Sequence, residues 1–151
     1  MNITSPDFTD GERIPERFTA DGINVNPELI ISEIPEETQS LVLIVDDPDA
    51  IRVCGFTWVH WVLFNIPVTN SFIRIPENTI LGTPGSSTYK KPEYLGPNPP
   101  KKTGVHNYYF KVYAVDKILN LPEMAPLTYI MEDLENHIIE KSQMFGTYER
   151  R

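Results

Sequence analysis

The stretch LVLIVDDPDA, at residues 41–50, is the part of this chain that says most about its fold. Its first five residues form an unbroken apolar run rich in β-branched side chains, which predicts a strand buried on both faces. The run ends at two aspartates, a proline and a third aspartate, and these residues are typical of a turn. A buried strand that leads carboxylates into a rigid turn can form one side of a small polar pocket.

Two further stretches predict strands, WVHWVLFNI at 58–66 and YYFKVYAV at 108–115. Both faces of residues 58–66 are mostly apolar, so we expect this strand to be central, and regular alternation would place His60 on one face with Val62 and Phe64. His106 lies two residues before Tyr108 and should point the same way. Residues 29–31 predict a shorter strand.

The segment 82–104 contains five prolines, at 84, 92, 97, 99 and 100, and few aliphatic residues. A loop of this length in a small domain is usually functional or disordered. Because proline restricts the backbone, we expect Gly96 to Pro100 to be ordered and to form a pocket wall.

Near the C-terminus, Ile130, Leu134 and Ile138 follow a helical spacing, which predicts a helix from about Thr128 to Gln143 that stops by Gly146. Three strong strands and one late helix indicate a mainly β protein with an antiparallel sheet and a small helical part. The length of 151 residues favours a single domain, 1–151.

The composition excludes several classes of function. The formal net charge of −8 argues against a nucleic-acid surface, which would need a basic stripe. No stretch approaches the ~20 apolar residues of a membrane span, and the N-terminus lacks the pattern of a signal peptide. Cys54 is the only cysteine, so no intrachain disulfide is expected and a cytoplasmic location is the default.

The candidate polar groups each have a structural and a functional interpretation. Asp47 and Asp49 could accept hydrogen bonds from a ligand or a histidine, or simply stabilise a turn. His60 lies inside an apolar strand, where a lone histidine is more often a core residue than a ligand group. His137 lies beside the predicted helical stripe and is expected to be structural. Metal-binding spacing is absent, and Cys54 lacks a protease-like context, so we expect no metal site and an inert thiol.

Four motifs in this order resemble the phosphatidylethanolamine-binding protein family: DPDA at 47–50, WVH at 58–60, GPNPP at 96–100 and GVHNY at 104–108. The runs VHWVLFNIP at 59–67, VYAVD at 112–116 and GTYER at 146–150 resemble its prokaryotic, Raf-kinase-inhibitor-like branch. The resemblance extends from about Phe18 to Arg150.

The resemblance implies a two-sheet antiparallel β sandwich with a few short helices and a small anion-binding pocket at one end. It also implies which residues line the pocket; carried over to this sequence, these are Asp47, Asp49, Trp58, His60, Pro100, His106 and Tyr108. Family members bind phosphoryl headgroups there, and some inhibit kinases. The implied partners are a phosphoryl or carboxylate anion such as phosphoethanolamine, a protein such as a kinase, and a second copy in a homodimer. No cofactor is implied.

The sequence departs from the family at two positions. Ile51 stands where a second proline is usual, and Asn107 replaces the arginine that usually follows the motif histidine. We therefore expect a different loop after Asp49 and the loss of any ion pair that this arginine would make.

Three hypotheses for the function follow. The leading one is a non-enzymatic anion-binding domain in which the aspartates orient the histidines. The alternatives are an enzyme that uses an Asp–His pair as acid and base on a small phosphoester, and a module that interacts with proteins through its surface. In the leading hypothesis a neighbouring carboxylate raises the histidine pKa values, so anion binding should strengthen from about pH 8 to about pH 6.

Overall fold

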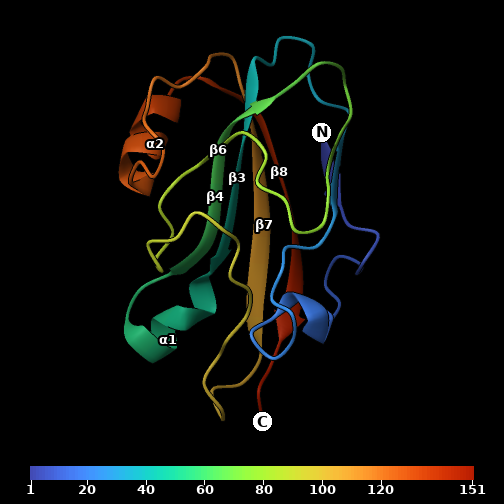
Figure 1. Cartoon of the computed structure of the whole chain (residues 1–151), viewed down its shortest axis with the longest axis vertical. Coiled ribbons are helices and arrows are strands. Elements are labelled where there is room, and N and C mark those ends of the chain that lie inside the picture. Colours follow the sequence, from blue (N-terminus) through green and yellow to red (C-terminus); the bar gives the residue numbers. More distant parts are fainter.

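Two antiparallel sheets form the frame of the molecule in the computed structural model, which describes all residues 1–151 (Figure 1). The larger sheet has five strands in the order β6 (Thr83–Pro84), β4 (Trp58–Pro67), β3 (Ser40–Asp47), β7 (His106–Val115) and β8 (Ile138–Tyr148). The smaller sheet has three, in the order β1 (Asn2–Thr4), β2 (Leu29–Ser32) and β5 (Ile73–Ile75). The helical elements are η1 (Glu16–Phe18), η2 (Pro48–Ala50), α1 (Ile51–Cys54) and α2 (Leu127–Leu134).

The fold class predicted from the sequence is confirmed. The predicted strands at 29–31, 41–45, 58–66 and 108–115 correspond to β2, β3, β4 and β7. Both long neighbours of β3 pair with it antiparallel, and β3 is buried along its whole length. The apolar run that suggested a strand covered on both faces is therefore the central strand of the larger sheet.

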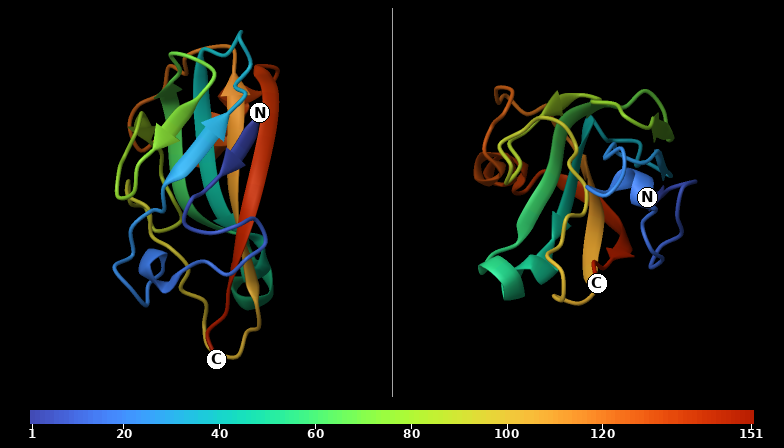
Figure 2. Two further views of the ribbon diagram at one scale, coloured as in Figure 1. Left: turned by 90° about the vertical axis from the view of Figure 1, so that its right-hand side faces the viewer. Right: turned by 60° about the horizontal axis from the view of Figure 1, so that its bottom comes forward.

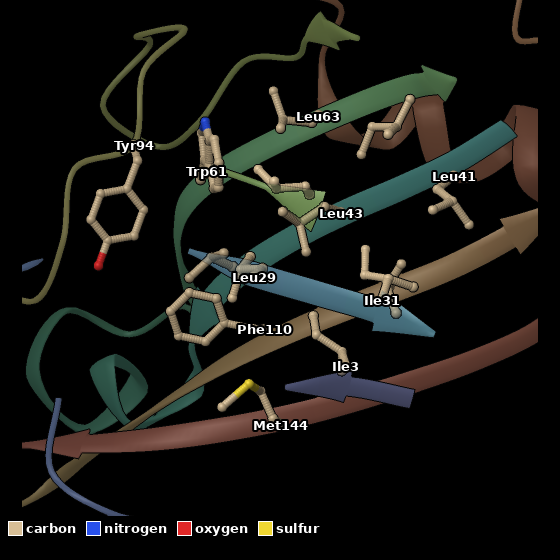
Figure 3. Packing of buried hydrophobic residues seen from close by; sticks show 14 of the residues in the cluster. Ile3, Leu29, Ile31, Leu41, Leu43, Trp61, Leu63, Tyr94, Phe110 and Met144 are labelled. Atoms are coloured by element: carbon tan, nitrogen blue, oxygen red, sulfur yellow. The ribbon is translucent and has the colours of Figure 1, made fainter. Parts of the chain in front are cut away.

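Two apolar clusters explain this burial. The first lies between the sheets, where Leu29 and Ile31 of β2 face Leu41, Leu43 and Phe110 of the larger sheet (Figure 3; Figure 2, left). The second covers the opposite face of the larger sheet, where Val42, Ile44, Val62 and Phe64 pack against Ile130 and Leu134 of α2. Alternate residues of β3 thus enter different clusters.

Strand β4 departs from regular alternation at two places. Val45 pairs with Trp61 while Asp46 pairs with Val59, so His60 is the extra residue of a β-bulge. A second irregularity, between the partners of Leu41 and Leu43, includes Asn65 with a left-handed φ of 52°. The prediction that His60 shares a face with Val62 and Phe64 was therefore wrong, since an extra residue reverses the order of faces.

The prediction of a helix over residues 128–143 is correct for the first part of this segment and wrong for the rest. Helix α2 ends at Leu134, and Asn136 takes a left-handed φ of 68°, which stops the helix. From Ile138 the chain forms β8, an edge strand paired with β7 along its length. Gly146 lies within this strand rather than at a helix end, and a Cβ there would approach Ile14 Cγ1 to 2.4 Å. In this strand Met144, Gly146 and Tyr148 are buried in alternation, as the period of a strand requires.

The arrangement of the strands creates one end of the molecule where several loops meet. Because β3 is antiparallel to its neighbours, its C-terminal end lies beside the first residues of β4 and β7. Helix α1 and the segment before β7 lie at the same end, near the C-terminus of the chain (Figure 1). No helix in the chain is long and apolar enough to span a bilayer.

Candidate functional site: a pocket between two histidines

A pocket of about 310 Å³ opens at this end of the larger sheet. Its walls come from the end of β3, from α1, from the starts of β4 and β7, and from the proline-rich segment. The residues that line it are Asp47, Ala50, Val53, Cys54, Trp58, His60, Tyr89, Asn98, Pro99, Pro100, His106 and Tyr108. Six of the seven residues predicted for the site are among them, with Asp49 the exception.

Asp47 and His106 form a buried pair at the base of the pocket. Their side chains are 5% and 1% exposed, and the Nδ1 atom of His106 lies 2.7 Å from Oδ2 of Asp47. The other carboxylate oxygen accepts the Ala50 N–H at 3.2 Å, which caps the turn η2. Asp47 thus performs both functions considered from the sequence, because it stabilises the turn and orients a histidine.

The second nitrogen of His106 lies against a hydroxyl. Nε2 is 3.0 Å from Oγ1 of Thr103, and that hydroxyl donates to the Pro100 carbonyl at 2.7 Å. The imidazole of His106 is therefore held on both sides, by the Asp47 carboxylate at Nδ1 and by the Thr103 hydroxyl at Nε2.

His60 is buried in a different way. Its side chain has no carboxylate partner, and its Nδ1 donates to the Leu95 carbonyl at 2.6 Å. Burial lowers the pKa of His60 to about 4, although the Leu95 carbonyl and the charge of Asp47 act in the opposite direction. The expectation that a neighbouring carboxylate raises the pKa of this histidine was therefore wrong, because desolvation outweighs the distant charge.

Tyr108 lies between the two imidazoles. Its ring meets His60 edge-on with centroids 5.3 Å apart, and it stacks with His106 at 6.2 Å. Burial raises the pKa of Tyr108 far above its ordinary range, and the negative charge of Asp47 raises it further, so the hydroxyl stays protonated. The i, i+2 spacing of His106 and Tyr108 on β7 gives them the shared direction that was predicted.

Asp49 supports the pocket from outside. Its carboxylate accepts the backbone N–H of Asn107 at 2.7 Å and pairs with Arg52 at 2.9 Å. Arg52 also donates to the carbonyls of Thr103 and Val105. The predicted position of Asp49 in the pocket wall thus differs from the structure, because the turn η2 directs Asp47 inward and Asp49 towards β7.

Arg52 also bears on the two departures from the family pattern, at residues 51 and 107. The chain continues from Asp49 into the short helix α1, with Ile51 exposed and helical. This helix carries Arg52 to Asp49, on the side where Asn107 provides only its backbone N–H. An ion pair is therefore present at Asp49 although residue 107 is not an arginine.

The segment Gly96 to Pro100 forms a wall of the pocket, as predicted. Gly96 donates to Oδ1 of Asn24 at 2.7 Å, and the Pro97 carbonyl accepts from the Ala20 N–H at 2.9 Å. A Cβ on Gly96 would lie 2.0 Å from the Phe18 carbonyl oxygen, so only glycine fits this close approach.

The comparisons with known proteins agree with this geometry. The family model described as phosphatidylethanolamine-binding protein matches residues 4–149, almost the whole chain. The chain belongs to the phosphatidylethanolamine-binding protein family. The expectation drawn from the four sequence motifs is thereby confirmed.

Three proteins of this family are similar to the chain over almost their full length. A protein named UPF0098 from Methanothermobacter thermautotrophicus is 38% identical, with 99% of each chain covered. The crystal structure of a phosphatidylethanolamine-binding protein homologue from Chlamydia trachomatis has a TM-score of 0.89 at 34% identity, covering 99% of this chain and 97% of its own. The YbcL protein of E. coli, described as a member of the mammalian family, has a TM-score of 0.88 at 27% identity, with coverage of 99% and 98%.

Several residues that line the pocket of this member of the phosphatidylethanolamine-binding protein family were not predicted from the sequence. Tyr89 packs edge-on against Trp58 and His60, at 5.3 and 5.7 Å, and Asn98 lines the proline-rich wall. Both lie in the segment 82–104, so the sequence marked the region but not the positions. Cys54, which was expected to be inert, also lines the pocket, with its sulfur 3.3 Å from the Ala50 carbonyl.

The charge of the pocket is unusual for a site expected to take anions. No lysine or arginine lines it, and Asp47 is its one carboxylate. The nearby Arg150 is held by Asp21, Asn98 and the Pro99 carbonyl. No group of three or more histidine, cysteine, aspartate or glutamate side chains gathers as a metal site anywhere in the chain. Attraction for an anion must therefore come from hydrogen-bond donors.

Proposed function

We propose that the pocket binds a small anion with a phosphoryl or carboxylate group, such as phosphoethanolamine, without chemical turnover. The observation that carries this proposal is the meeting of His60, His106 and Tyr108 in one pocket, although they come from two strands far apart in sequence. Membership of the phosphatidylethanolamine-binding protein family supports the same ligand class.

The donors available to an anion can be named. Arg150 holds the side-chain oxygen of Asn98 at 2.8 Å, so the amide NH₂ of Asn98 remains free to donate. The Tyr108 hydroxyl keeps its proton. Nε1 of Trp58 is buried without a partner in the chain and is a third donor. The wall itself supplies few backbone donors, because Pro97, Pro99 and Pro100 have no N–H. Neutral hydrogen bonds from these side chains are enough for a weak to moderate anion site.

Titration calorimetry with phosphoethanolamine, inorganic phosphate and acetate tests this proposal. Tyr108→Phe removes one hydroxyl and should weaken binding by about fivefold to tenfold. Tyr113→Phe is the matched control, because Tyr113 lies on the same strand and outside the pocket. Absence of heat with all three anions, or equal loss in both variants, would contradict the assignment.

A second candidate, an acid–base enzyme, is favoured by one specific observation. Thr103, His106 and Asp47 are connected by contacts of 3.0 and 2.7 Å, in the order of a nucleophile, a base and an orienting carboxylate. The contact of the Thr103 hydroxyl with the Pro100 carbonyl at 2.7 Å argues against this reading, since a proton donated to that carbonyl is not available to His106.

Hydrolysis of p-nitrophenyl acetate and p-nitrophenyl phosphate separates the two candidates. The binding proposal expects no turnover above the buffer rate. Turnover that is lost in Thr103→Val and kept in Thr69→Val, a threonine distant from the pocket, would favour the enzyme. The predicted regulation of a kinase stays a prediction.

A further inference from the structure

Nε2 of His60 is one of the polar atoms of the pocket that have no partner within the chain, and the buried Nε1 of Trp58 is another. His60 is 3% exposed, and its Nδ1 is committed to the Leu95 carbonyl at 2.6 Å. A carbonyl oxygen can only accept, so Nδ1 carries the proton. The other ring nitrogen, Nε2, makes no hydrogen bond to the protein, and His60 lines the pocket.

The surroundings of His60 determine what Nε2 can do. The titratable side chains that share the pocket with it are Asp47, Cys54, Tyr89, His106 and Tyr108. Because burial keeps the imidazole neutral above its pKa of about 4, Nε2 presents a lone pair and acts as an acceptor. The pocket therefore combines donors from Trp58, Asn98 and Tyr108 with an acceptor on His60.

A fully deprotonated anion would be repelled by this acceptor. Its oxygens would face the lone pair of Nε2 and the carboxylate of Asp47, with no lysine or arginine among the lining residues to compensate. An anion that keeps one O–H group can instead donate to Nε2 while its other oxygens accept. Sites built to receive a ligand hydroxyl reject analogues that lack it, because the protein group is then left unpaired.

We propose that His60 makes the pocket selective for singly protonated phosphomonoesters over tetrahedral anions that carry no proton. This inference rests on the proposed function, since it specifies the ligand form taken by the same pocket. His60 is then a specificity-determining residue, and its tautomer is set by the backbone carbonyl of Leu95.

The test compares phosphoethanolamine with ethanolamine O-sulfate by calorimetry at about pH 5.5. A phosphomonoester has a second pKa of about 6, so at this pH both ligands carry mainly one negative charge on a tetrahedral group. They differ in the P–OH, which the sulfate ester lacks. We expect the phosphomonoester to bind about tenfold more tightly or better. Its affinity should fall by roughly tenfold for each pH unit above about 6, while that of the sulfate ester should not show this fall.

His60→Gln is the decisive variant, because an amide can turn its NH₂ towards a deprotonated oxygen. The affinity ratio of the two ligands should fall close to one in this variant and stay unchanged in His137→Gln, a histidine outside the pocket. The comparison in the wild-type protein stands by itself if His60→Gln does not fold.

The possible results separate the two proposals. Affinities within about threefold of each other in the wild-type protein would overturn the selectivity and leave the anion-binding proposal intact. A large ratio that persists in a folded His60→Gln would also overturn it, since another group would then be responsible. If phosphoethanolamine, inorganic phosphate and acetate all fail to bind, the proposed function fails and the inference fails with it.

Discussion

The protein contains two histidine–aspartate pairs with nearly the same geometry in opposite environments. His106 and Asp47 are 2.7 Å apart and have side chains 1% and 5% exposed. His137 and Asp116 are 2.8 Å apart, but their side chains are 41% and 47% exposed. The first pair lies at the pocket end of β7, and the second joins the start of β8 to the residue after β7 at the other end of the same strands.

The difference shows that distance alone does not assign a role to such a pair. Water can replace each partner at the exposed pair, so its contribution to stability is small. At the buried pair water has little access, and loss of one partner leaves the other buried without its hydrogen-bond partner. From the sequence, His137 was expected to be structural and His106 to line the pocket, and burial gives the physical difference between them.

Removal of the buried carboxylate should give the largest effect on stability. Asp47→Ala leaves His106 unpaired and frees the Ala50 N–H, and we expect the free energy of unfolding to fall by about 3–5 kcal/mol. Urea denaturation followed by circular dichroism measures this change. A loss of less than about 1 kcal/mol would show that burial does not distinguish the two pairs.

The next effect concerns His60, which has no carboxylate partner at all. Its pKa in the folded protein is about 4, below the ~6.5 expected of the unfolded chain. The unfolded state therefore takes up a proton first as the pH falls, so stability is lost between about pH 6.5 and pH 4, by about 3 kcal/mol in total. Urea denaturation at several pH values should show this slope in the wild-type protein.

His60→Gln should flatten the slope, and His137→Gln should not. The comparison between variants matters because burial raises the pKa of Asp46, which acts with the opposite sign at the acidic end of the window. The Asp46 contribution is common to all three proteins and cancels in the difference. An equal slope in wild-type protein and His60→Gln would contradict the assignment.

Arg52 lies between the two extremes, since it is 44% exposed and yet bound to a carboxylate and two backbone carbonyls. We expect Arg52→Met to reduce the free energy of unfolding by about 1 kcal/mol. Arg74→Met is the control, because Arg74 is 57% exposed and its single contact with Glu28 measures 3.7 Å. Equal effects of both substitutions in urea denaturation would mean that the contacts of Arg52 with the loop before β7 add nothing.

The smallest effect is expected at the exposed pair. Asp116→Ala should change the free energy of unfolding by less than about 1 kcal/mol, and high salt should remove most of that difference by screening. Urea denaturation at low and high salt measures both quantities. A salt-independent loss as large as that of Asp47→Ala would remove the distinction between the two pairs.

Much of the fold could be predicted because the strands have strong local patterns. The apolar run 41–45 enters both clusters, as a strand covered on both faces must. The region 128–148 was predicted poorly because its apolar residues satisfy two periods. Ile130 and Leu134 do pack as a helix, but Ile138 begins an edge strand and is 40% exposed. Pairing with β7, a contact distant in sequence, decides this region.

The sequence predicted most of the residues that line the pocket, but it did not predict what each of them does there. Motif order identified Asp47, His60, His106 and Tyr108, all of which line the pocket. It could not separate Asp47 from Asp49, because the geometry of η2 sends neighbouring carboxylates to opposite sides. It also could not find Tyr89, whose position depends on a loop that lies against β4.

The sequence by itself determined the family, the central strands and the stiff wall, because each depends on local backbone preference or on motifs in a fixed order. Only the tertiary structure decided the partners and the burial of the two histidines. A bulge brings His60 to the Leu95 carbonyl, and the antiparallel neighbours of β3 bring His106 to Asp47. Burial then gives equal side chains different chemistry, since the cost of a charge depends on how much water and which partners surround it.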